Sequence, residues 1–293
     1  MKRNCPNSHC KSDQIKKNGF YKRANDSRKV QRFKCKICNK EFSASTGTLE
    51  YNQKKRRVNY LLLQLFSSKV SQRRAAKIVK VNKNTVARKF DYWAKKAAVK
   101  NKRFKQKLKK NKATSIQLDD MITKEKTKLK PLSISVVSDK NRRFILGAKV
   151  SQIPSFGLLA KISVKKYGYR KSYHVQKLDE LFNDFSTVVC KNALIESDMH
   201  QNYEPVVKKY FPHSQYNQFK SEKGCIAGQG ELKKTKFDPL NSINHNLAML
   251  RDGISTLVRK SWAVTQDPKR LQGHLEIYMY YHNQIYLRGL AAP

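Results

Sequence analysis

Acidic residues are scarce in this chain of 293 residues. It has 21 Asp and Glu against 63 Lys and Arg, which gives a formal net charge of +42. The shortage is uneven, because residues 1–113 carry 5 acidic and 35 basic residues, whereas residues 114–293 carry 16 and 28. Over residues 51–113, Asp91 is the single acid among 22 basic residues. This excess of positive charge indicates that the first part of the chain binds a nucleic acid.

Long apolar runs are lacking as well. No stretch of the sequence approaches the roughly 20 apolar residues that a membrane-spanning helix needs. The first residues, Met1 to Cys5, lack the apolar core of a signal peptide. No long amphipathic helix with an exposed apolar face stands out, which disfavours a membrane surface as the partner of the basic segment. We therefore expect a cytoplasmic protein with no membrane partner.

Cysteine is sparse, and six cysteines in a cytoplasmic protein argue against a disulfide framework. Four of them form two close pairs that are separated by 24 residues: Cys5, Cys10, Cys35 and Cys38. Four thiolates satisfy tetrahedral Zn²⁺, so residues 1–48 are predicted to form a zinc ribbon that the structural metal helps to fold. His9 is an alternative ligand, and Cys190 and Cys225 are interpreted as packing residues.

Residues 52–99 have the apolar spacing of helices. Ser71 is predicted to cap the second helix and Asn84 the third, with a turn over 80–83 between them. The pair has helix-turn-helix form, and its charge favours a DNA-binding domain over an ordinary helical hairpin. The residues predicted to contact base edges or phosphates are basic or polar: Lys54, Lys55, Arg56, Arg57, Arg73, Arg74, Asn84, Thr85, Arg88 and Lys89.

Residues 100–113 are rich in Lys and Arg and are predicted to be a basic linker that follows the DNA backbone. Beyond them the pattern changes to strands over 116–118, 133–138, 143–150 and 194–198, with a hairpin around Asp139. Helices are predicted over 175–184, 239–260 and 268–286. Residues 114–293 are therefore expected to form one α/β domain.

Two short apolar runs of this domain each end in an aspartate, Asp119 and Asp198. Two carboxylates that are brought together hold divalent metal for phosphoryl transfer. Asp120 faces the opposite side of an extended chain from Asp119, so it either orients Asp119 or is solvated. His200 and Asn202 either support the site or belong to the surface.

A third metal ligand is expected from the helix over 239–260. Asn244 and Arg251 are seven residues apart, close to two helical turns, and so share a face. An amide oxygen ligates Mg²⁺, although less strongly than a carboxylate because it carries no charge. The sequence leaves three alternatives to Asn244 open: Glu231, Asp238 and His245.

With these motifs in place, the sequence resembles bacterial insertion-sequence transposases of the DDE superfamily. Such proteins carry a zinc ribbon and a helix-turn-helix in front of an RNase H-like catalytic domain. The resemblance rests on the order of ten stretches: Leu118–Asp120, Lys128–Ser133, Arg143–Gly147, Ile195–Asp198, Gly228–Lys234, Phe237–Leu240, Asn244–His245, Met249–Arg251, Arg259–Trp262 and Tyr281–Asn283.

The resemblance implies that Asp119 and Asp198 are the first two catalytic acids. Asn244 falls where the superfamily usually has glutamate, and Arg251 matches a basic residue that contacts DNA phosphate. It also implies an enzyme that cleaves and joins DNA strands with Mg²⁺ or Mn²⁺ at the terminal inverted repeats of its element. We expect such a protein to act as a homo-oligomer on double-stranded DNA in the bacterial nucleoid.

Two other functions compete with this interpretation. A DNA-binding regulator derived from a transposase that has lost catalysis is favoured by Asn244, which is not a carboxylate. A zinc-ribbon protein that binds RNA also accounts for the basic charge. The RNA-binding alternative offers no reason for Asp119 and Asp198.

Overall fold

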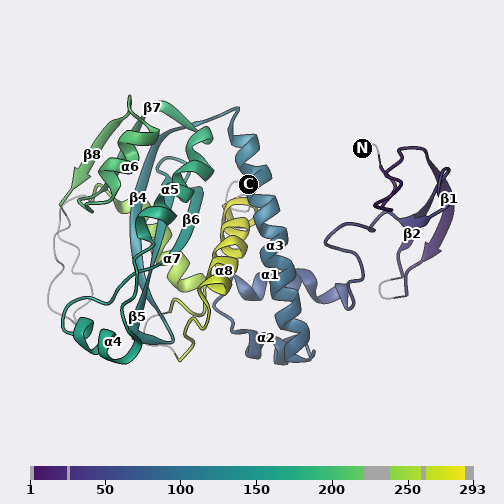
Figure 1. The fold of residues 1–293 in the computed structure, drawn as a ribbon, viewed down its shortest axis with the longest axis horizontal. Helices are drawn as coiled ribbons and strands as arrows, with labels where there is room; N and C mark the ends of the chain where they lie inside the picture. The colour runs from purple at the N-terminus through teal and green to yellow at the C-terminus, as the bar shows by residue number, and fades with distance from the viewer. Residues whose placement is uncertain (1–2, 25–26, 221–237, 259–261, 288–293) are drawn as a thin grey trace. The chain divides into compact units, whose positions relative to one another are not determined.

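The computed structural model describes residues 3–24, 27–220, 238–258 and 262–287 of the chain (Figure 1). The chain divides into two compact units, Met1–Leu62 and Leu63–Pro293. Several residues that the sequence singled out lie outside the described residues, namely Cys225, Glu231 and the motif stretches 228–234 and 259–261.

The first unit holds a small antiparallel sheet of β1 (Ile15–Lys22), β2 (Lys29–Cys35) and β3 (Glu41–Ser43). A short 3₁₀ helix, η1 (Arg56–Val58), follows. Among the described residues of 3–48, Cys5, Cys35 and Ser43 are the buried ones. A sheet with so little buried apolar surface depends on another source of folding energy, which agrees with a bound metal.

Helix α1 (Asn59–Phe66) crosses the boundary between the units, and α2 (Gln72–Ile78) and α3 (Lys83–Leu108) follow it. The predicted cap of α2 is confirmed, because Oγ of Ser71 accepts a hydrogen bond from the backbone N–H of Arg74. The predicted cap of α3 is wrong by two residues. Asn82 caps this helix, and its side chain accepts from the backbone N–H of Asn84 at 2.8 Å.

Helix α3 is longer than the sequence predicts, since it continues through most of the expected linker at 100–113 and ends at Leu108. Asn101, Phe104 and Leu108 are buried at helical spacing within this basic stretch. Helix α3 packs along α8 (Pro268–Tyr281), where Asn101 Nδ2 lies 2.8 Å from Glu276 Oε2. Helices α2 and α3 therefore belong to the second compact unit, together with α8.

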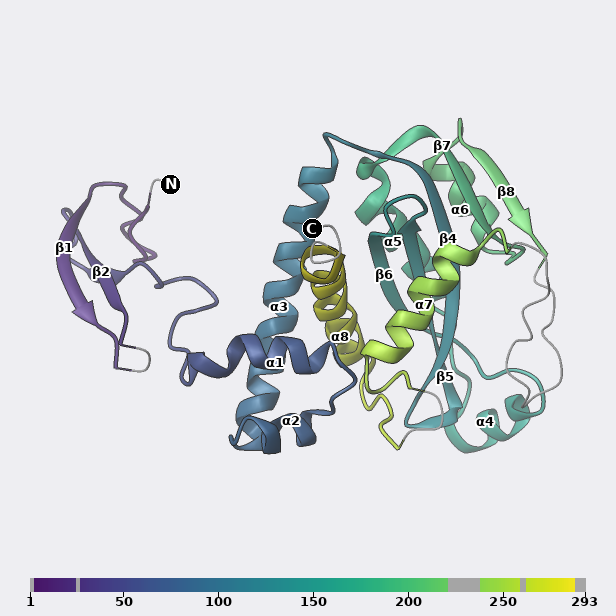
Figure 2. The ribbon, with the colours of Figure 1, turned by 180° about the vertical axis from the view of Figure 1, so that it is seen from behind.

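The second unit is a mixed α/β structure around a five-stranded sheet in the order β6-β5-β4-β7-β8. Strands β4 (Ala113–Glu125), β5 (Thr127–Asp139) and β6 (Ile145–Gln152) are antiparallel neighbours, which confirms the predicted hairpin after Asp139. Strands β7 (Val189–Asp198) and β8 (Gln215–Phe219) run parallel to β4. Helices on both faces cover this sheet, as Figures 1 and 2 show.

Each face of the sheet carries its own apolar core. Ile116 and Leu118 of β4 pack with α5 (His174–Phe185) and α6 (Tyr203–Tyr210). Met121, which alternates with them, packs on the other face with α7 (Asn241–Gly253) and α8. Two short helices, η2 (Ser186–Val188) and the π-helix η3 (His282–Tyr286), and helix α4 (Leu159–Tyr167) complete the described elements.

None of the described helices is both long enough and apolar enough to span a membrane.

Helix α7 is shorter than the predicted helix over 239–260, since it runs from Asn241 to Gly253. Cys190, which the sequence assigned to packing, is half-buried against the core between the sheet and α5.

Candidate functional site

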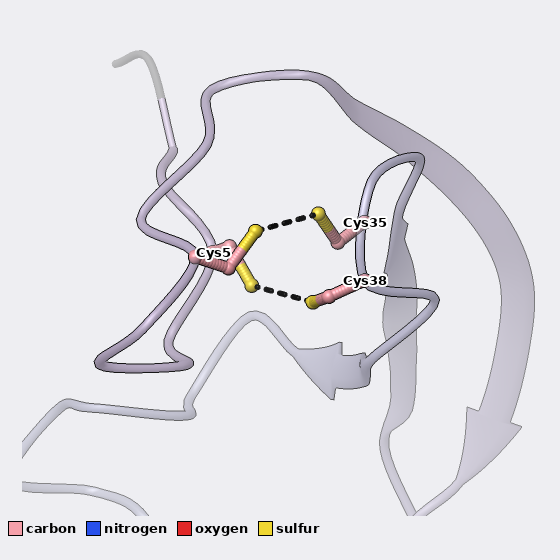
Figure 3. A group of neighbouring side chains, drawn as sticks. Cys5, Cys35 and Cys38 are labelled. Atoms are coloured by element: carbon pink, nitrogen blue, oxygen red, sulfur yellow. Dashed lines mark hydrogen bonds between the residues drawn. The ribbon is translucent and has the colours of Figure 1, made fainter.

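The four cysteines of the first unit lie together, and Figure 3 labels three of them, Cys5, Cys35 and Cys38. Their sulfur atoms all lie within 4.8 Å of one another, with Cys5 and Cys38 at 3.4 Å and Cys10 and Cys35 at 3.7 Å. Four sulfurs bound to one tetrahedral zinc ion at 2.3 Å would lie about 3.8 Å apart. The cluster therefore fits a structural Zn²⁺ ion.

The environments of these thiols differ. Desolvation raises the pKa of Cys5 to about 12, whereas the backbone N–H of Lys40, with smaller contributions from the neighbouring thiols, lowers the pKa of Cys38 to about 6. The protein thus favours a thiolate at Cys38, and a thiolate is the form that binds Zn²⁺.

Asp119 and Asp198 lie side by side on adjacent parallel strands. Leu118 of β4 is paired with Ser197 of β7, so the next residue of each strand is one of the two aspartates. Asp198 is the last residue of β7, as predicted. Asp119 does not end its strand, because the pairing of β4 with β5 continues for several residues beyond it to Glu125.

Both carboxyl groups resist ionisation. Burial, together with the nearby charge of Asp198, raises the pKa of Asp119 to about 7, against the lowering effect of a hydrogen bond from the Asp120 N–H and of the Arg251 charge. Burial also raises the pKa of Asp198. Two carboxyl groups that are hard to ionise together are stabilised as anions by a cation between them.

Helix α7 is anchored beside this pair by Gln117, which the sequence did not single out. Its Oε1 accepts from the backbone N–H of Ile243 at 2.9 Å, and its Nε2 donates to the carbonyl of Pro239 at 2.7 Å and to Glu196 at 2.8 Å. The helix thus starts beside Gln117, and its Arg251 lies near enough to Asp119 to influence that carboxyl group. No sequence motif marks a buried Gln–Glu pair, because its partners are far apart in the chain.

Asn244 is exposed on α7, and its Nδ2 donates to Oδ2 of Asp238 at 2.8 Å. Two alternatives to Asn244 can also be located. Asp238 is this exposed partner, and His245 is exposed on the same helix as Asn244. The hydrogen bond of Asn244 to Asp238 does not test whether Asn244 is a third metal ligand, so that role stays a prediction.

Asp120 occupies the opposite face of β4 and is held by a buried network. Nε2 of His174 donates to Oδ2 of Asp120, and Ser133 Oγ donates to the same oxygen at 2.9 Å. The Asn202 side chain lies 2.9 Å from Nδ1 of His174. Although burial opposes ionisation, the hydrogen bond and the charge of His174 hold the pKa of Asp120 below its usual range. The sequence pointed to Asn202 and His200 but missed His174, which carries no motif.

Most residues predicted to contact DNA are exposed. Arg56 is half-buried and donates to the backbone carbonyls of Glu50 and Gln53, and Thr85 is half-buried. The others on the surface are Lys54, Lys55, Arg57, Arg73, Arg74, Asn84 and Arg88.

The prediction that Lys89 lies on the exposed side of its helix is wrong, because this residue is only 6% exposed. It follows Val86 by three positions and precedes Trp93 by four, so it shares the buried face of α3 with both. The alkyl stem of a lysine can occupy such a position while its amine reaches a polar partner.

The comparisons with known proteins do not add a family to these observations. No protein-family model and no curated protein matches the sequence of this chain. Any function is therefore inferred from the geometry of its own residues.

Proposed function

We propose that the protein is a DDE-type DNA transposase, an enzyme that binds the terminal inverted repeats of an insertion sequence and cleaves and joins DNA strands. The observation that carries this proposal is the register of β4 and β7, which makes Asp119 and Asp198 neighbours. Their raised pKa values indicate a pair of carboxyl groups that a divalent cation would stabilise in the ionised form. Paired carboxylates of this kind serve phosphoryl transfer in nucleases and polymerases.

The fold supports the same proposal. A sheet of three antiparallel strands followed by two parallel strands, with helices on both faces, is compatible with the RNase H-like domain that the resemblance implies. Asp119 and Asp198 would hold Mg²⁺, which when bound activates a water or a 3′-hydroxyl and stabilises the leaving oxygen. Arg251, near Asp119, is suited to hold a DNA phosphate beside the pair.

The remaining parts of the chain support DNA binding. Helices α2 and α3, which we interpret as a helix-turn-helix, carry Arg73, Arg74 and Arg88 at their surface. The first unit, which precedes them in the sequence, adds exposed basic residues around η1. Because Lys and Arg displace counterions from DNA, we expect binding to weaken steeply with salt.

The test is cleavage of DNA that carries the terminal repeats, with Mg²⁺ or Mn²⁺. We expect nicks at the ends of the repeats from the wild-type chain and none from Asp198→Ala. Asp179→Ala removes a half-buried aspartate of α5 that pairs with Lys209, and it serves as the matched control, which should cleave like the wild type. Nicking that persists in Asp198→Ala would contradict the proposal.

The second candidate is a DNA-binding regulator that has lost catalysis. One observation favours it: Asn244 is exposed and hydrogen-bonded to Asp238, and it brings no charge to the two aspartates. Tight and specific binding to the terminal repeats without cleavage under either metal would favour this candidate. In that case Asn244→Glu is the variant to examine, because it restores the usual carboxylate.

A further inference from the structure

Three metal-ligating side chains meet on the face of β4 that lies opposite to Asp119. Asp120 belongs to β4, His174 begins α5, and His200 follows the end of β7. One ligand atom of each lies within 4.8 Å of the other two. Imidazole nitrogen together with carboxylate oxygen suits zinc-type cations, whereas Mg²⁺ prefers oxygen ligands alone.

Oδ1 of Asp120 is buried and makes no hydrogen bond of normal geometry within the described part of the chain, and the buried hydroxyl of Tyr203 lies near the same carboxyl group. The Tyr203 side chain is 0% exposed, and burial together with the charge of Asp120 raises the pKa of its hydroxyl well above its usual range. The hydroxyl is therefore close to this carboxylate. Buried polar atoms without partners are costly, and a cation bound by Asp120 would remove part of that cost.

We propose that Asp120, His174 and His200 form a binding site for a divalent cation of the zinc type. Three protein ligands leave a further position open to water. The proposal goes beyond the proposed function, because these ligands are not the pair Asp119 and Asp198. The bound cation would tie β4 to the start of α5 and to the segment after β7, directly behind Asp119.

The hydrogen bonds around the site suit the binding of a cation. Nε2 of His174 donates to Asp120, and a cation bound by both residues would displace this proton to solvent. The side chain of Asn202 lies 2.9 Å from Nδ1 of His174, and with its amide group turned it would accept from Nδ1–H, which supplies the partner that metal-bound histidines usually have. The ring of His200 is held by the backbone N–H of Asn202, which donates to its Nδ1 at 3.2 Å.

Co²⁺ titration of the full chain tests the proposal. The chain is first stripped of metal, and excess Mg²⁺ is present to occupy sites made of oxygen ligands. Co²⁺ bound by thiolates gives an intense sulfur-to-cobalt absorption band in the near ultraviolet, whereas Co²⁺ bound by histidine and aspartate gives only weak visible bands. We expect two Co²⁺ ions per chain, one with the thiolate band and one without it.

The variants assign the second ion. His200→Ala and His174→Gln should each weaken its binding at least about tenfold and leave the thiolate band unchanged. His213→Ala removes an exposed histidine and should retain both ions. Asp198→Ala should retain the second ion as well, which separates this site from the proposed catalytic one. A single Co²⁺ per wild-type chain would overturn the proposal, and so would a second ion that is lost in Asp198→Ala but kept in both histidine variants.

Discussion

Asp119 and Asp120 are adjacent residues of one strand, and the protein gives their carboxyl groups opposite properties. Asp119 faces α7 with Asp198 as its neighbour, and burial and that neighbouring charge raise its pKa to about 7. Asp120 faces α5, where hydrogen bonds from His174 and Ser133 lower its pKa despite burial. The difference shows that the partners of a carboxyl group, and not its burial alone, decide whether it is ionised.

The comparison also separates two kinds of site. The carboxyl group of Asp119 is destabilised as an anion and is therefore suited to bind a cation from solution. Asp120 is already held as an anion by His174 and Ser133, so the cation that we propose at Asp120 would join elements of the fold and take no part in cleavage. Substitutions at Asp119, His174 and Ser133 test this division.

Asp119→Asn should abolish metal-dependent nicking, with a loss of at least about 100-fold. The loss of a direct metal ligand should exceed the 10–100-fold effect of changing an outer partner. Cleavage rates with Mg²⁺ and with Mn²⁺ measure it. Full activity in Asp119→Asn, with correct folding shown by circular dichroism, would mean that this carboxylate has no role in cleavage.

The pH dependence of stability should differ between wild type and Asp119→Asn. Because the pKa of Asp119 is raised when the chain folds, its contribution to stability is fully present below the ordinary value of 3.8 and is lost as the pH rises to about 7. In the absence of metal, the wild type should lose about 3 kcal/mol more than Asp119→Asn between about pH 5 and about pH 8. Urea denaturation at both pH values measures the difference, and equal pH dependence would contradict the raised pKa.

His174→Ala should destabilise the fold by about 2–3 kcal/mol at neutral pH, since it leaves the buried Asp120 carboxylate without its main partner. The lowered pKa of Asp120 stabilises the protein above its ordinary value, and this stability is lost as the pH falls through the lowered pKa. The variant should therefore differ most from the wild type at neutral pH and least in acid. His174→Gln retains a donor and should recover part of the loss in thermal denaturation.

Ser133→Ala should have the smallest effect, about 1 kcal/mol, because it removes one hydrogen bond to Asp120 and leaves that from His174. Denaturant midpoints of the wild type and the variant measure it. A loss as large as that of His174→Ala would mean that the serine, and not the histidine, is the main support of Asp120.

Much of the fold could be predicted because it depends on local patterns. The hairpin after Asp139 and the cap at Ser71 follow from turn chemistry and capping. The close approach of Cys5, Cys10, Cys35 and Cys38 follows from the spacing of their pairs. The extension of α3 to Leu108 was not predicted, because the many Lys and Arg residues of this stretch hid its apolar pattern. Asn101, Phe104 and Leu108 recur there at helical spacing and are buried.

The candidate site could be predicted only in part. Asp119 and Asp198 were recognisable because each follows an apolar run. Their partners were not, because the contacts of Asp120 with His174 and of Gln117 with Ile243 join residues 54 and 126 positions apart. The burial of Lys89 was missed because the charge of a lysine predicts exposure, while its position on α3 places it beside Val86 and Trp93.

The basic charge of the first part of the chain, the two close cysteine pairs and four strands of the α/β unit follow from the sequence alone, whereas β8 was not predicted. These properties depend on residue type and short spacing, which folding does not change. Only the tertiary structure decided which carboxyl groups meet and which are ionised. The reason is that β4 and β7 pair in parallel across a long connection, and this pairing alone sets Asp119 beside Asp198 and turns Asp120 toward His174.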